Sequence, residues 1–451
     1  MAAVTEPIPA NPDQINDDIL RVLEPPTPLY VLMVLFLATL VGIALVAFLY
    51  QTYWGLGVTG LTHPVMWGVY ITTFVFWVGI AHAGTLISAI LFLFRAKWRN
   101  AVNRGAEAMT VFAVLIAAMF PLIHIGRVYK FYFMVPYPNQ RGVWPNFKSP
   151  LVWDLFAINT YMITSIMFFY VGLIPDLAAA RDRVRDWRRY LYRALSLGWR
   201  GSGEQWRHWA RAVLHLSGLS TPLVLSVHSV VSWDFATSLV PGWHTTIFAP
   251  YFVAGAIFSG IAMVITVLVP VRKAFHLEAY LRKEHFDNMG KLILLTSSVV
   301  GYAYGMEYLM AWYSANPYEQ MSFWYRGFGY HWTSTWIMIS CNVLSPLPLW
   351  FKWCRTNVAW MWVTSIFINI GMWFERYVII MTGLSHEYDP AAWGYYVPSV
   401  TELTILVGSF ALFLTMFTVF LRLAPVVAIQ EIKELWYEDR ARAHGHAGGH
   451  H

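Results

Sequence analysis

The sequence is short of charged residues and of cysteine. Among its 451 residues, 12% are charged, about half of the roughly 25% that is usual in soluble globular proteins. A chain with so few charges cannot cover its surface with groups that water stabilises. Its thiols are Cys341 and Cys354, and two thiols cannot hold an iron–sulfur cluster or build a disulfide framework. The composition therefore argues against a soluble domain and against a chain that carries its own electron relay.

Long apolar segments take the place of the missing charge. Hydrophobic residues make up 57% of the chain, and the mean hydropathy is +0.48. Ten segments each approach the roughly 20 residues that a helix needs to cross the hydrocarbon layer of a membrane. These predicted spans are Leu29–Tyr50, Trp67–Phe94, Ala106–Ile125, Leu155–Leu177, Val213–Leu239, Ile247–Val271, Lys291–Trp312, Thr333–Phe351, Val358–Met381 and Val400–Leu423. We therefore predict an all-α, polytopic membrane protein with about ten transmembrane helices.

Basic residues indicate how the predicted spans are oriented. Most of the 31 Lys and Arg lie in the loops after even-numbered spans and in the C-terminal tail. The loops after odd-numbered spans contain Arg127, Lys130, Arg141, Lys148 and Arg326. Because Lys and Arg are enriched in cytoplasmic loops, the even-numbered side is predicted to be cytoplasmic, with both termini on that side.

The polar parts of the chain predict no partner beyond the membrane itself. Arginines between residues 181 and 211 alternate with Trp and Tyr, a mixture found on nucleic-acid-binding surfaces. A juxtamembrane helix that lies on anionic lipid headgroups has the same composition. The second explanation is simpler, so we predict contact with membrane lipid and none with nucleic acid.

The domain boundaries follow from the outermost spans. Residues 1–28 are predicted to form a cytoplasmic arm, residues 29–424 the membrane domain, and residues 425–451 a cytoplasmic tail. The tail ends in HGHAGGHH, which suits either metal binding or a solvated end. No metal site is assigned to it.

Ionisable side chains inside the predicted spans gather near the non-cytoplasmic ends. An ionised group at the bilayer centre costs about 2.5–3.5 kcal/mol on insertion scales, so each is a candidate functional residue. At the outer level lie His124, Arg127, Asp154, Asp234, Glu307, Glu375, Arg376 and Glu402. Near the cytoplasmic ends lie Glu107 and Asp176. Adjacent residues of a helix point about 100° apart, so Glu375 and Arg376 are expected to meet partners on other helices.

His82 lies in the middle of the second span, within the segment GIAHAGTLISA (79–89). The small residues around it predict close approach of another helix; they are Gly79, Ala81, Ala83, Gly84 and Ser88. We expect His82 to be buried and bonded to a hydroxyl or carbonyl group. The alternative is a place on a proton path toward the cytoplasm, together with Glu107 and Asp176.

Two other classes of membrane protein fit parts of this pattern. A b-type cytochrome needs histidines on facing helices at matching depth, and His215 and His228 share one span without a matching pair on a second. A secondary transporter uses buried carboxylates and intramembrane ion pairs, but no broken helix is evident at mid-depth in two corresponding halves. The cytochrome is disfavoured, and a proton or ion transporter stays open.

A quinone site fits the residues at the outer level better. A quinol loses two electrons and two protons, so its site needs proton acceptors near both ring hydroxyls. Histidine titrates near neutral pH, and a carboxylate in apolar surroundings is a suitable second acceptor. His124 and Asp154 lie at adjoining ends of consecutive spans, joined by the Pro- and aromatic-rich loop 126–150, which is predicted to cover the site as an apolar lid.

Four segments in order carry a more specific signal: HPVMWGVYITTFVFWVGIAHAGTLISAILFLFR (63–95), NRGAEAMTVFAVLIAAMFPLIHIGR (103–127), PYPNQRGVWPNFKSPLVWDLFAINTY (136–161) and GLIPDLAAARD (172–182). Together they resemble the NrfD/polysulfide-reductase family of membrane subunits. The most similar branch is the larger one with ten helices, found as the quinol-binding subunit of bacterial alternative complex III.

The resemblance implies two four-helix bundles plus peripheral helices, with spans 2–5 in the first bundle and spans 6–9 in the second. It implies a menaquinol site in the first bundle, with His124 and Asp154 as the catalytic residues. Further quinol-binding candidates are Arg127, Asp234 and Arg376. The candidates for a proton path are His82, Glu107, Asp176, Glu307, Glu375 and Glu402.

The resemblance also implies partners in the bacterial cytoplasmic membrane. This chain is expected to hold no metal or haem, and to pass electrons to an extracytoplasmic iron–sulfur subunit and then to c-type cytochrome subunits. A homologous NrfD-like membrane subunit is expected beside it. The predicted function is menaquinol oxidation in an alternative-complex-III-like oxidoreductase, with proton translocation as an open addition. The alternatives are a quinone-reducing anchor of a molybdenum oxidoreductase, because partners set the direction of electron transfer, and a transporter.

Overall fold

The computed structural model describes residues 11–135, 142, 147–434 and 436–437. Within these residues the fold is all-α and contains no strand, as predicted. The α-helices are α1 (Pro12–Leu20), α2 (Pro28–Trp54), α3 (Gly68–Thr85), α4 (Leu91–Leu93), α5 (Asn103–His124), α6 (Pro150–Arg183), α7 (Arg188–Leu195), α8 (Gly203–Ala236), α9 (Phe248–Ala274), α10 (Lys283–Tyr313), α11 (Pro317–Gly327), α12 (Trp332–Ile339), α13 (Lys352–Thr356), α14 (Val358–Ser385) and α15 (Val400–Leu423).

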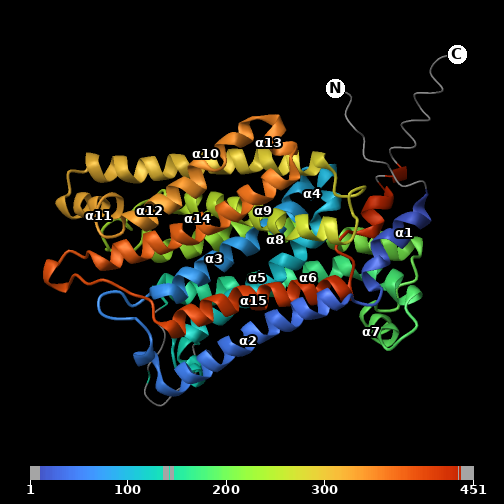
Figure 1. Ribbon diagram of the computed structural model, residues 1–451, viewed down its shortest axis with the longest axis horizontal. Coiled ribbons are helices and arrows are strands. Elements are labelled where there is room, and N and C mark those ends of the chain that lie inside the picture. The colour runs from blue at the N-terminus through green and yellow to red at the C-terminus, as the bar shows by residue number, and fades with distance from the viewer. Residues whose placement is uncertain (1–10, 136–141, 143–146, 435, 438–451) are drawn as a thin grey trace.

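Eight helices of the described chain are long and apolar enough to cross a membrane: α2, α3 continued by α4, α5, α6, α8, α9, α14 and α15. The seventh predicted span falls on α10, a 31-residue helix made less apolar by Glu307 and by several Ser, Thr and Tyr. The eighth predicted span is divided into α12, a π-helical turn at Ser340–Leu344 and a 3-10 turn at Leu347–Trp350. Both segments lie along the same bundle (Figure 1). The chain is therefore an all-α, multi-pass membrane protein.

Seven long helices and the shorter α12 pack as two groups of four. The first group contains α3, α5, α6 and α8, and the second contains α9, α10, α12 and α14. The groups join where α9 packs against α3 and α8, and where α14 packs against α3. Helices α2 and α15 pair with each other at the periphery, and α15 also contacts α5 (Figure 1). This is the expected arrangement of two bundles with peripheral helices.

Side-chain caps mark where four of the long helices begin. A cap satisfies a backbone N–H that the first helical turn leaves without an internal partner. The capping pairs are Thr27 with the N–H of Tyr30, Ser202 with that of Gln205, Asn357 with that of Ala359, and Ser399 with that of Glu402. Each cap directly precedes a long helix whose composition is apolar, or becomes apolar after its first turns.

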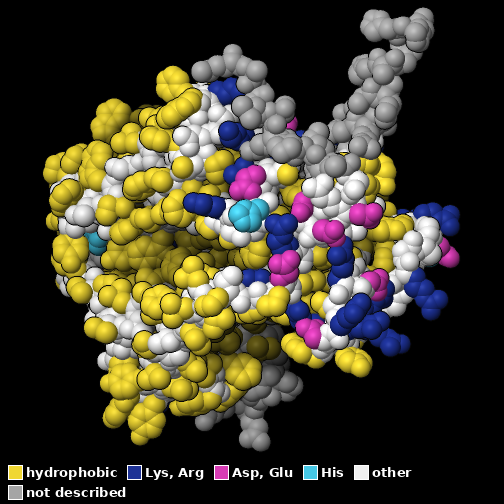
Figure 2. Space-filling model, turned by 45° about the vertical axis from the view of Figure 1, so that its right-hand side comes forward, with side chains coloured by type: hydrophobic (Ala, Val, Ile, Leu, Met, Phe, Trp, Pro, Cys, Tyr) yellow, Lys and Arg dark blue, Asp and Glu magenta, His cyan; other side chains and the backbone are white. Residues whose placement is uncertain are grey.

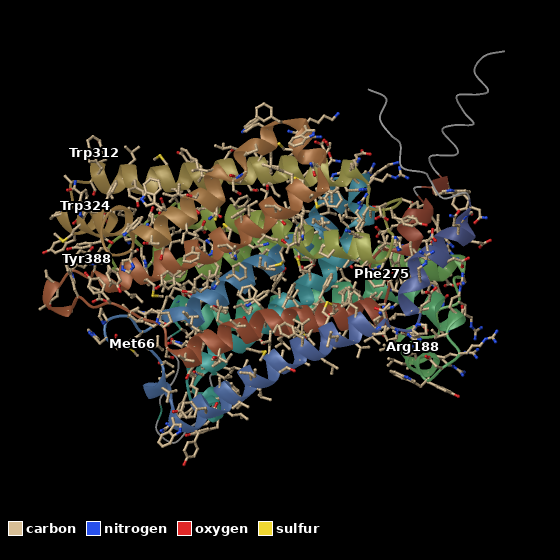
Figure 3. All side chains as sticks on the ribbon, in the orientation of Figure 1. Met66, Arg188, Phe275, Trp312, Trp324 and Tyr388 are labelled. Carbon is tan, nitrogen blue, oxygen red and sulfur yellow. The ribbon has the colours of Figure 1, made fainter. Side chains whose placement is uncertain are left out.

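The two ends of the molecule differ in their exposed side chains. The Arg104 end contains the start of α5 together with α1 and α7, and the Asp154 end contains the start of α6 and the end of α8 (Figure 1). Lys and Arg gather toward the first of these ends (Figure 2). Exposed aromatic side chains such as Trp312, Trp324 and Tyr388 stand at the second (Figure 3). Aromatic rings in such positions are typical of a membrane–water boundary.

The described part of the N-terminal arm is packed against the Arg104 end. Ile15, Ile19 and Val22 are buried there, and the Tyr280 hydroxyl donates a hydrogen bond of 2.9 Å to Asp18. Burial, with this hydrogen bond to Asp18, raises the pKa of the Tyr280 hydroxyl above its usual range. The arm is therefore a structural part of this end, and its cytoplasmic location stays a prediction.

Small residues let α3 approach two neighbours to the distance of backbone contact. A Cβ atom at Gly84 would lie 2.3 Å from the carbonyl oxygen of Ala106 on α5. A Cβ atom at Gly260 of α9 would lie 2.1 Å from the Cβ atom of Ala83. Neither position accepts a larger residue unless a helix moves. The close approach predicted around His82 is confirmed, and it involves a helix on each side.

We predict that Gly260→Ala lowers the unfolding temperature of the detergent-solubilised protein. The added methyl group must push α9 away from α3, and overpacking of this kind typically costs about 1–3 kcal/mol. Gly218→Ala is the matched control, because Gly218 is also helical and has nothing within 4 Å of its Cβ position. Alanine there should be neutral or stabilising. Equal unfolding temperatures for the two variants would contradict the close contact between α3 and α9.

Candidate functional site

Two carboxyl groups meet at the Asp154 end of the first bundle. Asp154 lies near the start of α6, and Asp234 lies near the end of α8. The residues before them, Trp153 and Trp233, pack edge to face with their ring centroids 6.1 Å apart. This contact holds the two helices at one level, and the two carboxyl groups are close enough to interact electrostatically.

The two carboxyl groups have unsatisfied oxygen atoms. Asp154 is 5% exposed, and both of its oxygens are buried without a hydrogen-bond donor. The Oδ1 atom of Asp234 is buried in the same way. Two adjacent carboxylates repel each other when both are ionised, and a proton on one of them allows it to donate to the other. The pair is therefore suited to hold and exchange a proton, or to accept hydrogen bonds from a ligand.

His124 is the last residue of α5, at this same end of the bundle. Its Nδ1 atom is buried and makes no hydrogen bond. Beside it, the amide of Gln51 on α2 donates 2.8 Å to the Ile123 carbonyl, and Tyr70 donates to the Gln51 side-chain oxygen. Gln51 is fully buried and was not identified from the sequence, although a glutamine at the edge of an apolar span was an available signal.

Arg127 and Glu402 occupy different surroundings from the acid pair. Arg127 is exposed, and its guanidinium packs beside the C-cap of α2. Glu402 holds the start of α15 to a neighbouring loop, because it accepts hydrogen bonds from the Gly60 N–H at 2.7 Å and the Tyr396 hydroxyl at 2.6 Å. Burial and this carboxylate raise the pKa of Tyr396 above its usual range. Glu402 thus has a structural role, and its place on a proton path stays a prediction.

Two histidines pair in the centre of the first bundle. His82 of α3 hydrogen-bonds the Val78 carbonyl through Nδ1, so the expectation of a buried, bonded histidine is confirmed. Its ring centroid lies 4.5 Å from that of His228 on α8, a contact that the sequence did not reveal. No porphyrin fits between rings this close. His215, the other histidine of the cytochrome alternative, is exposed and bonds the Arg211 carbonyl at 2.7 Å.

Polar side chains continue from His82 toward the Arg104 end. The Tyr161 ring stacks on His82 with 4.9 Å between centroids, and its hydroxyl lies 2.9 Å from the Thr85 hydroxyl. Thr85 in turn borders a small pocket whose other polar lining residues are Ser88, Glu107, Thr110, Ser165 and Ser220. Ser88 belongs to a π-helical turn at Leu86–Ile90. These side chains form a polar line between the histidine pair and Glu107.

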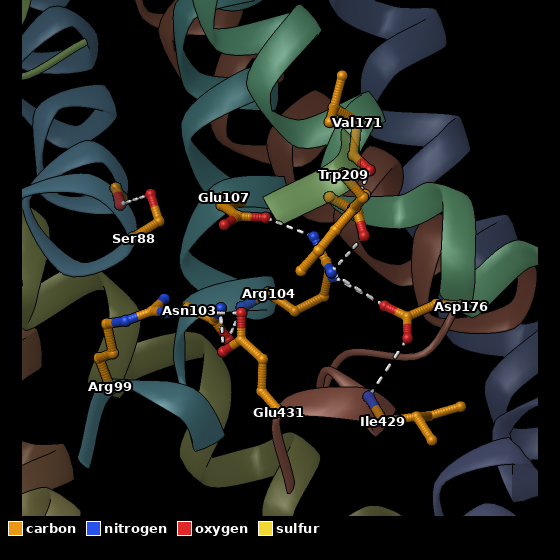
Figure 4. Close-up of polar contacts among 12 residues, drawn as sticks. Ser88, Arg99, Asn103, Arg104, Glu107, Val171, Asp176, Trp209, Ile429 and Glu431 are labelled. Carbon is orange, nitrogen blue, oxygen red and sulfur yellow. Dashed lines mark hydrogen bonds and ion pairs between the residues drawn. The ribbon is translucent and has the colours of Figure 1, made fainter. Parts of the chain in front are cut away.

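Arg104 organises the ion pairs at the far end of this polar line (Figure 4). Its guanidinium lies 2.6 Å from the Glu107 carboxylate and 3.0 Å from that of Asp176, and it donates to the Gly172 carbonyl at 2.7 Å. Asp176 also accepts the N–H of Ile429 at 3.3 Å. The sequence predicted the two acids separately and placed Arg104 in a loop, because the third span was expected to begin at residue 106. Helix α5 begins at residue 103, so Arg104 is inside it.

The second bundle has its own buried charges. Tyr304 of α10 donates to Glu375, and Asn342 donates to the Tyr304 hydroxyl at 2.8 Å from the π-helical turn after α12. The guanidinium of Arg376 lies 4.7 Å from the centroid of the Phe252 ring on α9. The expectation that Glu375 and Arg376 meet partners on other helices is therefore confirmed. They also pair with each other, which was not expected.

A second ion pair lies nearer the Asp154 end of the second bundle. Glu307 and Arg326 are 3.1 Å apart, and Arg326 also donates to the Thr382 hydroxyl at 3.1 Å. Arg326 was assigned to an outer loop, yet it is 2% exposed because α11 turns its side chain back into the bundle. Arg376 and His228 both lie against the Phe252 ring, at 4.7 Å and 5.9 Å from its centroid, so the charges of the second bundle adjoin the histidine pair of the first.

Metal-binding residues do not cluster in the part of the chain that the structure describes. No group of three or more His, Cys, Asp or Glu there could hold a metal ion. The histidine-rich tail HGHAGGHH lies outside the described residues, as does most of the middle of loop 126–150, the predicted lid.

The family model for the polysulphide reductase NrfD matches residues 57–386. That range includes His124, the Asp154–Asp234 pair and the interior charges of both bundles. The chain belongs to the NrfD polysulphide reductase family. As an NrfD-family protein it is a membrane subunit of an oxidoreductase complex, so it works with partner subunits.

Three relatives extend over most of this NrfD-family chain. A Halobacterium salinarum protein, provisionally named as a membrane subunit of a dimethyl sulfoxide reductase, is 26% identical over 411 residues, which cover 82% of this chain and 86% of the relative. A selenate reductase subunit of Mesobacillus selenatarsenatis is 22% identical and covers 82% and 88%. The Hdr-like menaquinol oxidoreductase integral membrane subunit of Archaeoglobus fulgidus is 21% identical and covers 90% and 96%.

We predict that Arg104→Met strongly destabilises this NrfD-family protein. The change leaves Glu107 and Asp176 buried and uncompensated, and breaking a buried ion pair in this way costs about 3–5 kcal/mol. Thermal unfolding in detergent measures the loss, with Arg189→Met as the control because Arg189 is exposed on α7. Adding Glu107→Gln and Asp176→Asn should restore part of the stability. An unfolding temperature equal to that of the control would show that Arg104 does not hold this end together.

Proposed function

We propose that this chain is the quinol-binding subunit of an alternative-complex-III-like oxidoreductase, and that it oxidises menaquinol at the Asp154 end of the first bundle. The observation that carries the proposal is the Asp154–Asp234 pair, whose buried oxygens lack hydrogen-bond donors. A quinol hydroxyl is a donor of the required kind. The unpaired Nδ1 of His124 at the same end provides a second acceptor, as two-proton chemistry requires.

In the proposed reaction, quinol enters from the lipid phase and hydrogen-bonds His124 and Asp154 through its two hydroxyl groups. One proton passes to the imidazole and the other to the carboxylate. Asp234 stabilises the protonated Asp154 by accepting a hydrogen bond from it. An iron–sulfur cluster of a partner subunit would take the two electrons one at a time, and quinone would remain. Both protons and both electrons of the quinol are thereby accounted for without a redox group in this chain.

The names of the relatives support two versions of this role. The Archaeoglobus relative is named as a menaquinol oxidoreductase subunit, which supports menaquinol as the substrate. The relatives named after dimethyl sulfoxide and selenate reductases favour the second candidate function, a membrane anchor of a molybdenum oxidoreductase. Purification of the intact complex from native membranes distinguishes the two. Iron–sulfur and c-haem subunits support the first candidate, and a molybdenum subunit supports the second.

We predict that Asp154→Asn lowers menaquinol oxidation by the intact complex by about 10²–10⁴-fold, the range typical of general acid–base catalysis. Asparagine keeps the shape of the side chain but cannot accept the proton. His124→Ala should cause a loss of similar size. The assay follows reduction of the complex's own electron acceptor by a menaquinol analogue.

Asp182→Asn is the control for that experiment, because the Asp182 side chain is 69% exposed at the far end of α6. It should leave turnover unchanged. If Asp154→Asn and His124→Ala both retain normal menaquinol oxidation while the complex stays intact, the proposed site is wrong.

We infer that the polar line from His82 to Glu107 conducts protons toward the Arg104 end, which would couple quinol oxidation to proton movement. The hydrogen bond of 2.9 Å between the Thr85 and Tyr161 hydroxyls joins the histidine pair to the small pocket beside Glu107. Thr85→Val removes the hydroxyl and keeps the side-chain shape. We expect fewer protons moved per quinol in proteoliposomes that contain the complex, with quinol oxidation retained.

Thr72→Val is the matched control for proton movement. Thr72 is fully buried on the same helix and bonds the Gly68 carbonyl of its own backbone. A pH-sensitive dye inside the vesicles reports the protons moved. An unchanged ratio of protons to quinol in Thr85→Val would exclude this route without affecting the assignment of the quinol site.

A further inference from the structure

A deep apolar groove lies between α2, α9, α14 and α15, away from the residues of the proposed quinol site. Its volume is about 720 Å³, within the range of about 300–1,000 Å³ that is usual for ligand sites. Its walls include Phe76, Met263, Trp373 and Phe410. Figure 2 shows a hollow walled by hydrophobic side chains, with Lys and Arg gathered to one side of it.

The groove has the length of one membrane leaflet. It reaches along α15 from Arg422, in the last turn of the helix, to Leu406. Sixteen residues of helix span about 24 Å, and half of a bilayer including its headgroup region measures about 20–22 Å. Phe275 also lines the groove beside Arg422 and lies toward the Arg104 end (Figure 3). The groove therefore extends from the membrane surface at that end to about the middle of the bilayer.

An uncompensated positive charge stands at the mouth of the groove. The Arg422 guanidinium lies 4.7 Å from the centroid of the Tyr30 ring and 5.4 Å from that of Phe275. Its Nη1 donates to the carbonyl oxygens of Val22 and Glu24, both at 3.2 Å. Its Nε is buried without an acceptor, and no carboxylate in the described chain forms an ion pair with it. An arginine whose guanidinium has no carboxylate partner is well suited to bind a phosphate group.

We propose that an anionic phospholipid from the leaflet at the Arg104 end occupies this groove. Its phosphate binds Arg422, and an acyl chain follows the apolar walls to Phe410. The positive mouth and the apolar, leaflet-long walls match the two halves of a phospholipid. The lining also contains Thr266 and Asn369, whose side chains hydrogen-bond each other at 3.0 Å, so a quinone is the competing ligand that the test must exclude.

The test uses the complex purified from native membranes, stripped of loosely bound lipid with detergent. The probes are phosphatidylglycerol and phosphatidylcholine, each with a photoreactive diazirine in one acyl chain. After illumination, peptide mass spectrometry locates the labelled residues. We expect phosphatidylglycerol to label the groove walls around Met263 and Phe410, and phosphatidylcholine to label them much less.

Three variants define the result. Arg422→Gln should reduce phosphatidylglycerol labelling about tenfold, as expected when a charge-assisted hydrogen bond is lost, and Arg422→Lys should retain part of it. Leu406→Trp should block labelling by filling the groove. Arg189→Gln removes an exposed arginine at the same end and should change nothing, which controls for general attraction of anionic lipid.

Four results would overturn the proposal. They are equal labelling by the two lipids, equal labelling of wild type and Arg422→Gln, loss of labelling when menaquinone is added, and protection of the groove by a partner subunit. Displacement by menaquinone would indicate a quinone site in the groove, and the variants Asp154→Asn and His124→Ala then test the Asp154 site separately. The other three results do not bear on the Asp154 site.

Discussion

Helix α3 can touch α5 and α9 at backbone distance because the contact points are Gly84 and Gly260, and the rest of the interior depends on that approach. It joins the two bundles through α9 and leaves α3 buried along nearly its whole length. It also brings His82 against His228 and Tyr161. Packing of small residues drives helix association in lipid, where no hydrophobic force acts between helices.

Burial imposes a second constraint, because an ionisable group away from water needs a partner. In the described chain most such groups have one: Glu107 has Arg104, Glu307 has Arg326, and Glu375 has Tyr304. The Asp154–Asp234 pair departs from this rule, since its neighbouring groups have the same charge when ionised. A structural role explains the paired groups. No such structural partner is present among the described residues for Asp154 and Asp234, which is why the proposed function assigns proton exchange to them.

Three groups of buried polar side chains lie one after another along the long axis of the molecule. The acid pair lies at one end, the histidine pair in the centre, and the Arg104 network at the other end. Both π-helical turns adjoin this polar interior, through Ser88 in one and Asn342 in the other. Such turns are frequent at functional sites because they displace backbone groups and side chains from their regular helical positions. The apolar groove lies at the periphery beside α2 and α15, and none of the residues of the acid pair, the histidine pair or the Arg104 network lines it.

Hydropathy and the cost of buried charge were enough to predict the all-α membrane fold and to select Asp154, Asp234 and the Glu375–Arg376 pair as candidates. Both are local properties, so they can be recognised in one chain. Which groups meet became known from the packed helices: Asp154 with Asp234, His82 with His228, and Arg104 with two acids. The packing also moved Arg104 and Arg326 from predicted loops into the bundle. These outcomes depend on helix rotation and on exact helix ends, which are set by contacts between segments far apart in the chain.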